Sequence, residues 1–598
     1  MPASLGEYAL IGDCETAALV AKNGSVDWLC LPRFDSPACF AALLGSPQNG
    51  HWQLAPKSKF RASRCYRPDT MILETRFRTA HGTVSVTDFM PSPRRSSRPA
   101  VVRILRGERG TVPIRMSLAI RFDYGRTIPW VRQEGKLVTG GVGPDRLTLH
   151  ASVPLAADEL CSTAEFSVRT GQQISLVLQY ENAFRRQASP PEANLLLKQT
   201  EMWWRKWISR CRYKGPWAGA VRRSLITLKT LTYAPTGGPV AAPTTSLPEV
   251  PRGQENWDYR FCWVRDTTFT LLAFTHAGFR SEARRLKDWL IRAAGNRPQQ
   301  LQVMYRPDGE RIWHEWQVPW LSGFSGATPV RVGNAARQQL QLDIYGELVD
   351  ALYQAGAVVA RKASDFELQR AIVGYVEENW RLPDHGIWEF RRRNLHFTHS
   401  KAMAWVAFDR TIKTAERFGL SGPIDHWKSI RTQIHREVCR HGFNTRLGSF
   451  VQSYGSHQVD ASLLLLPLVG FLPVSDPRII GTVKRIEQRL LRGGLVMRCE
   501  SPQQKGHAPQ QSTSEGAFLP CSLWLVDCYE LAGRRAEARR LLKRILRIRN
   551  EVGLLSEEYS VEKRKLVGNF PQALSHVALV NAIINFHTAR VRLVSGRE

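Results

Sequence analysis

Two glutamates in separate polar stretches of the chain could act together on one bond. Glu389 stands between Trp388 and Phe390, and Glu557 is followed directly by Glu558. A carboxyl held against aromatic rings loses hydration and favours its protonated form, which suits a general acid. A second carboxyl that activates water or attacks completes the pair typical of glycoside hydrolysis. Considered separately, each glutamate could equally be an ordinary loop residue without a catalytic role. The sequence gives no separation between them and so predicts neither retention nor inversion.

A third stretch, residues 255–266, combines two indoles, a phenol and paired opposite charges. Tyr259, Trp263, Arg265 and Asp266 could supply an apolar wall with bidentate hydrogen-bonding groups, as a polyhydroxylated ring requires. The alternative is that the arginine and aspartate form an ion pair at a helix start while the aromatic side chains are core. The 18 tryptophans of the chain fit a sugar-binding surface, because exposed indoles stack on flat apolar faces.

The chain is strongly basic, which raises the question of a nucleic-acid partner. Lysine and arginine number 83 against 53 acidic residues, a formal charge of +30, and the cations are spread along the whole chain. Residues 534–549 have helical spacing with interleaved leucine, which predicts a solvated helix face rather than a nucleic-acid site. We therefore expect no nucleic acid as a primary partner.

The cysteines and the apolar stretches indicate a cellular context. Eleven cysteines without a CxxC pair or zinc-type spacing predict reduced thiols and no metal site. The amino terminus lacks the pattern of a signal peptide. The longest apolar stretch, 461–474, contains Pro467 and Pro473 and is too short to span a bilayer. These features predict a cytoplasmic protein without a membrane partner; its oligomeric state is left open.

The first 190 residues have the pattern of an antiparallel β-sandwich. Segments with alternation or β-branched enrichment are separated by turn residues. The predicted strands are 83–90, 101–106, 114–122, 146–151 and 173–180. A helix with Trp203, Trp204 and Trp207 follows in 192–207. The predicted organisation is a sandwich domain over 1–190, a linker helix over 191–216 and a helical domain over 217–598.

The helical part predicts a barrel. Twelve segments show a 3.6-residue period: 217–233, 265–277, 280–294, 338–358, 363–380, 399–418, 423–440, 458–466, 476–492, 517–532, 534–549 and 571–592. Short and long connections alternate, so antiparallel helix pairs would gather the long loops at one end. Six hairpins closed into a ring, an (α/α)6 barrel, place these loops around one mouth, where binding and catalysis usually occur. A solenoid is the competing architecture, but no repeat of fixed period supports it.

At these residues the chain resembles glycoside hydrolase family fifteen, which contains glucoamylases and bacterial trehalases. The resemblance covers essentially the whole chain. The matching motifs are 11–14, 24–36, Tyr259-x-x-x-Trp263-x-Arg265-Asp266, 329–334, Trp388-Glu389, 396–401, Ser556-Glu557-Glu558-Tyr559 and 568–572.

The resemblance implies an inverting, exo-acting α-glucosidase that releases β-glucose and needs no cofactor or metal. Glu389 would be the general acid and Glu557 the general base. Tyr259, Trp263, Arg265 and Asp266 would hold the terminal glucose, and Trp388 would line the pocket beside the acid.

Departures from the fungal pattern bear on the substrate. Phe390 replaces an acidic residue after the acid, and Glu558 replaces glutamine after the base, where it could make a different substrate contact. A small disaccharide, trehalose, fits these differences better than granular starch. The alternatives are a glucoamylase-type enzyme acting on maltodextrin or dextran ends and, more remotely, a non-catalytic carbohydrate-binding protein. The choice depends on the loop 295–337, whose Trp313, Trp316 and Trp320 line the pocket or contact the β-domain.

Overall fold

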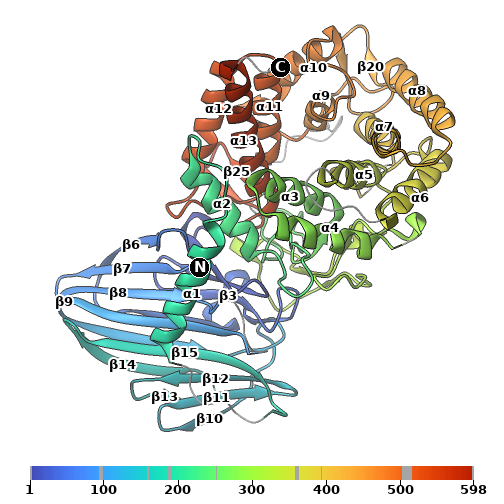
Figure 1. The fold of residues 1–598 in the computed structure, drawn as a ribbon. Helices are drawn as coiled ribbons and strands as arrows, with labels where there is room; N and C mark the ends of the chain where they lie inside the picture. Colours follow the sequence, from blue (N-terminus) through green and yellow to red (C-terminus); the bar gives the residue numbers. More distant parts are fainter. Residues whose placement is uncertain are drawn as a thin grey trace, which may run out of the picture.

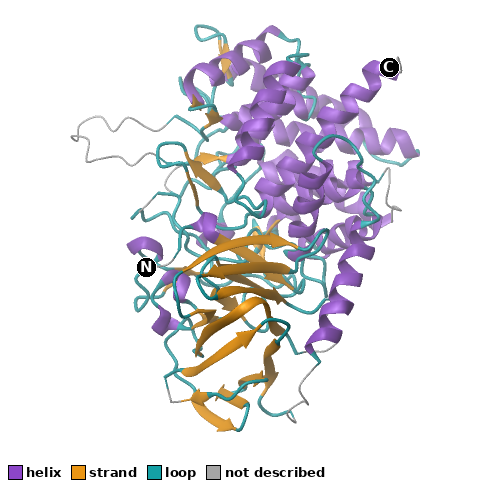
Figure 2. Cartoon of the chain, turned by 90° about the vertical axis from the view of Figure 1, so that its left-hand side faces the viewer, coloured by secondary structure: helices purple, strands orange, loops and turns teal. Residues whose placement is uncertain are grey.

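The computed structural model describes residues 3–92, 98–157, 160–185, 192–250, 252–295, 297–356, 363–391, 394–500 and 515–595. Two bodies lie side by side, with the strands at one end of the molecule and the helices at the other (Figures 1 and 2). None of the helices in these ranges combines the length and the apolar character needed to cross a membrane.

The N-terminal region is an antiparallel β-structure. Its strands are β1 (Tyr8–Gly12), β2 (Ala17–Ala21), β3 (Ser25–Cys30), β4 (Ala38–Phe40), β5 (His51–Pro56), β6 (Phe60–Tyr66), β7 (Leu73–Thr79), β8 (Gly82–Phe89), β9 (Ala100–Ala119), β10 (Trp130–Glu134), β11 (Leu137–Val142), β12 (Asp145–Ala151), β13 (Ala156–Ala157), β14 (Ser162–Arg169) and β15 (Gln173–Asn182). The order β1-β2-β3-β5-β9-β15-β12-β11-β10 runs across it. The predicted sandwich is confirmed.

One strand joins the two layers. The predicted strands 101–106 and 114–122 are the two halves of β9, a single strand of 20 residues. Its first half pairs with β8 and β15, and its second half pairs with β5 and β14. Gly107 and Gly110 lie where the partners change; the backbone of Arg169 approaches Gly107 so closely that a Cβ would clash. In the sequence these glycines indicate a turn. In the structure they allow β9 to continue from one sheet layer into the other.

Helix α1 (Ala193–Ile208) connects the two bodies. Its first half places Leu196 and Leu197 on a small apolar cluster of the sheet. Its second half packs Trp207 on Phe279 of the helical body, with ring centroids 4.4 Å apart, and the indole N–H donates to Glu282 at 2.6 Å. The helix therefore packs against both bodies.

The helical body is a closed double ring. The inner helices are α3 (Val264–Ala277), α5 (Asp343–Ala355), α7 (Thr398–Phe418), α9 (Leu465–Leu468), α11 (Leu519–Leu531) and α13 (Ala573–Ser595). The outer helices are α2 (Ala218–Thr230), α4 (Arg280–Ala294), α6 (Ala363–Asn379), α8 (Ile424–His441), α10 (Pro477–Leu490) and α12 (Arg535–Ile548). Each inner helix contacts the next, and α13 contacts α3, which closes the ring. This confirms the (α/α)6 barrel (Figure 1).

Burial distinguishes the two rings. Helix α11 is buried over nearly its whole length, as a helix that is apolar on all sides requires. Helix α12 buries Leu541, Leu542 and Ile545 and exposes Arg539 and Lys543. The basic segment 534–549 is thus a solvated outer face, as predicted. The prediction for 458–466 was less accurate, because a 3₁₀ turn (Ala461–Leu464) precedes the single turn of α9.

Short strand pairs brace the long loops. They are β16 (Cys262–Trp263) with β17 (Met304–Tyr305), β18 (Trp316–Gln317) with β19 (Arg331–Val332), β20 (Phe443–Asn444) with β21 (Ser449–Phe450), β22 (Leu491–Arg492) with β23 (Leu495–Val496), and the set β24 (Ala517–Phe518), β25 (Glu558–Ser560) and β26 (Lys565–Val567). The loops therefore have a backbone scaffold of their own.

Two of the three tryptophans of loop 295–337 contact the β-domain. The Trp320 indole donates to the Tyr124 backbone oxygen at 3.0 Å, and the Trp316 and Tyr124 rings lie 6.0 Å apart. Trp313 is 63 % exposed. Among the described residues the three indoles are not part of the cavity wall, so their interpretation as a domain contact holds for Trp316 and Trp320.

Candidate active site

A cavity of about 770 Å³ opens at one end of the barrel. All six long loops contribute to its wall. From the loop before α3 come Glu249, Gln254, Glu255, Trp257, Tyr259 and Trp263; from the other loops come Arg331 and Asn334, then Trp388, Glu389 and Arg391, then Gln452 and Gln458, then Arg498 and Glu515, and finally Gln572. The predicted gathering of the long loops around one mouth is therefore observed.

Side chains of residues 257–260 alternate, with Trp257 and Tyr259 in the cavity wall and Asp258 and Arg260 buried on the other side. Tyr259 and Trp263 face the cavity, with ring centroids 5.2 Å apart. Arg260 lies on the opposite side with no exposed surface. It donates to both carboxylate oxygens of Asp258, at 2.9 and 2.7 Å, and to the Tyr124 hydroxyl at 2.8 Å. The β-domain thus holds the segment that carries the aromatic wall.

Glu389 lies on the loop between α6 and α7 in a left-handed backbone conformation, φ 58°. Its carboxylate accepts the indole N–H of Trp263 at 2.7 Å and a guanidinium N–H of Arg265 at 3.3 Å. The side chain is 20 % exposed, so it borders the cavity. A non-glycine residue with this φ is uncommon and here re-aims one side chain out of a turn.

Trp388 forms the wall beside Glu389. Its indole N–H donates to Asp460 at 2.8 Å, and its ring lies against Phe518 and Trp524, with centroids 5.7 and 6.0 Å away. These contacts orient the indole, which leaves Trp388 as a fixed apolar surface of the cavity.

Glu557 has no exposed surface. One carboxylate oxygen accepts the Tyr259 hydroxyl at 2.5 Å, and the other accepts the backbone N–H of Asn569 at 2.9 Å. Burial raises the pKa of Glu557, while these two hydrogen bonds act in the opposite direction. Gly568 makes the arrangement possible, because a Cβ there would lie 2.6 Å from the carboxylate. Tyr259 lines the cavity, so the Glu557 carboxylate lies one hydrogen bond away from the cavity wall.

Arg265 and Asp266 occupy the first turn of α3. Arg265 pairs with Asp343 at 3.4 Å as well as with Glu389, so it joins the cavity to the inner ring instead of only capping its own helix. Asp266 lines the cavity and is 5 % exposed. Burial raises the pKa of Asp266 to about 7, against the influence of Arg265.

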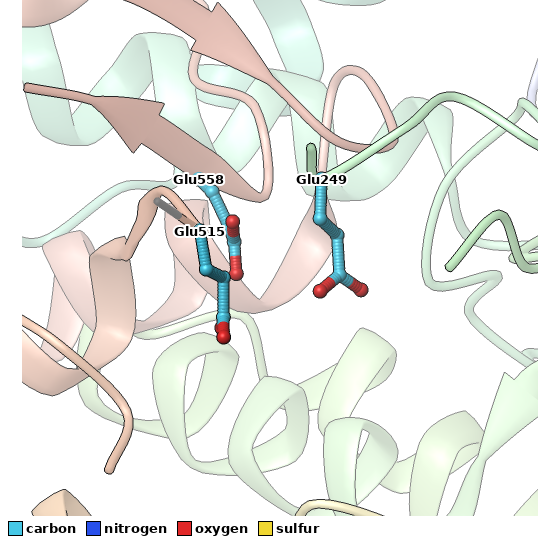
Figure 3. Close-up of side chains that lie close together, drawn as sticks. All are labelled: Glu249, Glu515 and Glu558. Carbon is cyan, nitrogen blue, oxygen red and sulfur yellow. The ribbon is translucent and has the colours of Figure 1, made fainter. Parts of the chain in front are cut away.

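A charged cluster that no sequence motif indicated lies next to Glu557. Arg498 pairs with three carboxylates, those of Glu249, Glu515 and Glu558. Figure 3 shows these three side chains side by side, and their oxygens approach one another within 4.8 Å. Such a group could hold a cation, and here the guanidinium supplies the positive charge. No local motif identified Arg498 or Glu249, because their partners are distant in sequence.

The structure brings together most of the predicted site residues. Tyr259, Trp263, Arg265, Asp266, Trp388 and Glu389 line the cavity, and Glu557 lies directly behind Tyr259. Glu558 is placed differently. It is fully buried, it is not among the described residues of the wall, and it contacts Arg498 at 3.4 Å. Glu557 directly precedes β25 and Glu558 is its first residue; successive side chains along a strand point in opposite directions, so only one of the two glutamates faces Tyr259.

Two family models cover this architecture. The model for glycosyl hydrolases family 15 matches residues 215–584, and a trehalase-like N-terminal model matches residues 2–194. The chain belongs to glycosyl hydrolases family 15. It is therefore a glycoside hydrolase, and the resemblance inferred from the motifs is confirmed.

Curated relatives of this family 15 chain match along almost its whole length. It is 37 % identical to a trehalase of Mycobacterium tuberculosis, over 97 % of this chain and 89 % of that protein. It is 34 % identical to a trehalase of Thermoplasma volcanium, over 98 % and 94 %. Among solved structures, a bacterial glucoamylase complexed with acarbose superposes with a TM-score of 0.75 at 12 % identity, covering 98 % of this chain and 94 % of that one. The last similarity concerns the fold alone.

Proposed function

We propose that this family 15 hydrolase cleaves the α-glucosidic bond of trehalose with inversion and releases β-glucose. One observation carries the assignment of its residues. Tyr259 and Trp263 are neighbours in the cavity wall, and each donates a hydrogen bond to a different glutamate, Glu557 and Glu389. Two carboxyls held on one aromatic wall fit the acid and base roles of glycoside hydrolysis.

Glu389 is assigned as the general acid. Its carboxyl borders the cavity, so it can reach the oxygen between the two sugars. As the bond from that oxygen to the anomeric carbon breaks, Glu389 transfers its proton to the oxygen, and the leaving glucose gains a hydroxyl group. Trp263 and Arg265 hold the carboxylate that results.

Glu557 is assigned as the general base, together with Tyr259. A water held by the Tyr259 hydroxyl and Glu557 attacks the anomeric carbon on the face opposite the leaving oxygen, and its proton passes to Glu557. Attack from the opposite face inverts the anomeric configuration, so α-linked glucose leaves as β-glucose. Arg498, paired with three carboxylates, contributes positive charge that favours the ionised form of Glu557.

The terminal glucose is assigned to Arg265, Asp266 and Trp388. Arg265 and Asp266 offer donors and acceptors at the buried end of the wall, and Trp388 offers a fixed apolar face. We do not assign a substrate contact to Glu558; its burial against Arg498 supports a positioning role.

Trehalose is favoured as the substrate by the relatives named trehalases, which match the whole chain. The second candidate, a glucoamylase-type activity on maltodextrin or dextran ends, would use the same two glutamates. A non-catalytic role is disfavoured because both carboxyls are present and held. Cys14, Cys262, Cys521 and Cys528 are buried free thiols, which supports the expected cytoplasmic location.

Proton NMR of the anomeric signals tests this function. The purified protein is mixed with trehalose, maltose or a short dextran and observed during the first minutes. We expect β-glucose to appear first and fastest from trehalose. Faster release from maltose or dextran would transfer the assignment to a glucan hydrolase, α-glucose as first product would contradict inversion, and silence on all three substrates would contradict hydrolysis.

A further inference from the structure

Four residues at the outer end of the cavity form a cluster with no role so far. Trp257, Arg331 and Arg391 line the cavity, and Glu315 lies behind them. They come from three different long loops. Arg391 is exposed, and its wall neighbours Gln254 and Glu255 are also exposed, whereas the wall residues around Glu389 are mostly buried. This rim cluster therefore borders the mouth.

Charge pairing and stacking fix the rim cluster. The guanidinium of Arg391 lies 3.6 Å from the centroid of the Trp257 ring, and that of Arg331 lies 4.4 Å from it. The Glu315 carboxylate accepts hydrogen bonds from both terminal nitrogens of Arg391, at 3.1 and 2.8 Å. It also forms an ion pair with Arg331 at 3.7 Å. One carboxylate thus pairs with two guanidiniums, so these four residues keep an excess positive charge.

The loop that carries Glu315 and Arg331 is also held by backbone pairing. Glu315 directly precedes β18, and Arg331 is the first residue of β19, where it lies opposite Gln317. The same loop contacts Tyr124 of the β-domain through Trp316 and Trp320. The Arg331 guanidinium also donates to the backbone oxygens of Gln254 and Asn256, at 2.7 and 3.1 Å. The rim is braced on two sides and is preorganised.

Arg391 connects this rim to the reacting bond. It lies two residues after Glu389 on one loop, and Gln339 donates to the backbone oxygen of Glu389 at 3.1 Å. A sugar bound against Arg391 would therefore lie close to Glu389, the residue assigned to protonate the leaving oxygen. Arginine suits this position because its planar fork donates to neighbouring hydroxyl groups of one ring.

We propose that Trp257, Glu315, Arg331 and Arg391 form the acceptor subsite, which binds the leaving glucose and restricts the cavity to a disaccharide. The inference rests on the proposed function. Arg391 and Arg331 donate to hydroxyl groups of the second ring, Trp257 stacks on both guanidiniums, and Glu315 pairs with both, so the two arginines are held in place. The pair Arg391–Glu315 ties loop 380–397 to loop 295–342 at the rim of the cavity, where a third sugar would have to pass.

The test compares substrates with and without a leaving sugar. Arg391→Ala and Glu315→Gln are assayed on trehalose, maltose, maltotriose and α-glucosyl fluoride, whose fluoride needs no acceptor subsite. We expect kcat/KM for trehalose to fall about 10- to 100-fold in each variant, as expected for loss of a hydrogen bond to a charged group. Hydrolysis of α-glucosyl fluoride should change less than threefold, and the maltotriose-to-trehalose ratio should rise about tenfold or more.

Arg381→Gln is the matched control. Arg381 also stacks on an indole, with its guanidinium 4.2 Å from the Trp380 centroid, but it is not part of the described cavity wall. It should leave every substrate unchanged. Equal losses on trehalose and α-glucosyl fluoride would make the rim cluster merely structural, and unchanged trehalose hydrolysis would remove it from the subsite. Both results overturn the inference. Wild-type hydrolysis of α-glucosyl fluoride without hydrolysis of trehalose would instead contradict the proposed substrate.

Discussion

The two glutamates of this active site have the same side chain and opposite surroundings. Glu389 borders the cavity and contacts an indole N–H and a guanidinium, whereas Glu557 is fully buried and contacts a hydroxyl and a backbone N–H. Each glutamate accepts a hydrogen bond from an aromatic side chain of the segment 257–263, Glu389 from Trp263 and Glu557 from Tyr259. Because this segment supplies an aromatic donor to both, the different roles of the two carboxyls depend on the other residues around each of them.

Replacement of the buried glutamate should have the largest effect. Glu557→Gln keeps the side-chain volume but cannot take a proton from water, so kcat should fall about 100- to 10,000-fold on trehalose. The same loss is expected on α-glucosyl fluoride, because attack by water is needed in both reactions. Glu562→Gln, an exposed change on the same loop, is the control. A Glu557→Gln variant that keeps a tenth of wild-type turnover would refute the assignment.

Replacement of the cavity-bordering glutamate should separate the two substrates. Glu389→Gln cannot donate a proton, so trehalose hydrolysis should fall by a similar factor. Fluoride leaves with little protonation, and hydrolysis of α-glucosyl fluoride should fall less than about tenfold. Steady-state rates on both substrates check this. Equal losses on the two substrates would mean that Glu389 does not act as the acid.

Removal of the Tyr259 hydroxyl should change the pH dependence. The hydrogen bond from Tyr259 lowers the pKa of Glu557, against the effect of burial. In Tyr259→Phe that pKa should rise, and because the base must be ionised, the acid limb of the kcat profile should move to higher pH. We also expect kcat to fall about 10- to 100-fold. Tyr559→Phe, a half-buried tyrosine of β25, is the control; an unmoved acid limb in Tyr259→Phe would contradict the pairing.

The smallest effect concerns the loop that carries Glu557. His576 is buried, and its Nε2 accepts the backbone N–H of Leu555 at 3.2 Å. Burial lowers the pKa of His576 to about 3 from 6.5, so the unfolded chain binds the proton between these values and the folded chain does not. Folding stability should therefore fall as the pH drops below about 6.5, with a slope of at most about 1.4 kcal/mol per pH unit for this group.

Denaturant unfolding at pH 7 and pH 4.5 measures this slope. His576→Gln should be less stable at pH 7 and should lose less stability on acidification than the wild type. His457→Gln, an exposed change, should have the wild-type dependence. A His576→Gln variant with an unchanged slope would show that this buried ring does not contribute to acid sensitivity.

Much of the fold followed from periodicity. The outer helices bury one stripe, as the residues of α12 show, so their boundaries were predicted to within a few residues. The exceptions are elements whose form depends on their neighbours. The two halves of β9 read as two strands because Gly107 and Gly110 resemble a turn. The single turn of α9 gave too short a signal to be distinguished from the 3₁₀ turn before it.

Apolar spacing, loop length and local motifs are properties of neighbouring residues, and they were enough to predict the barrel, its ring of long loops and the two glutamates. The folded chain was needed to show that Tyr259 bonds to Glu557, that Glu558 contacts Arg498, and that Arg391 stacks on Trp257 and pairs with Glu315. These contacts join residues of different loops. Their partners are set by the closure of the barrel and the packing of the β-domain, and no local pattern encodes them.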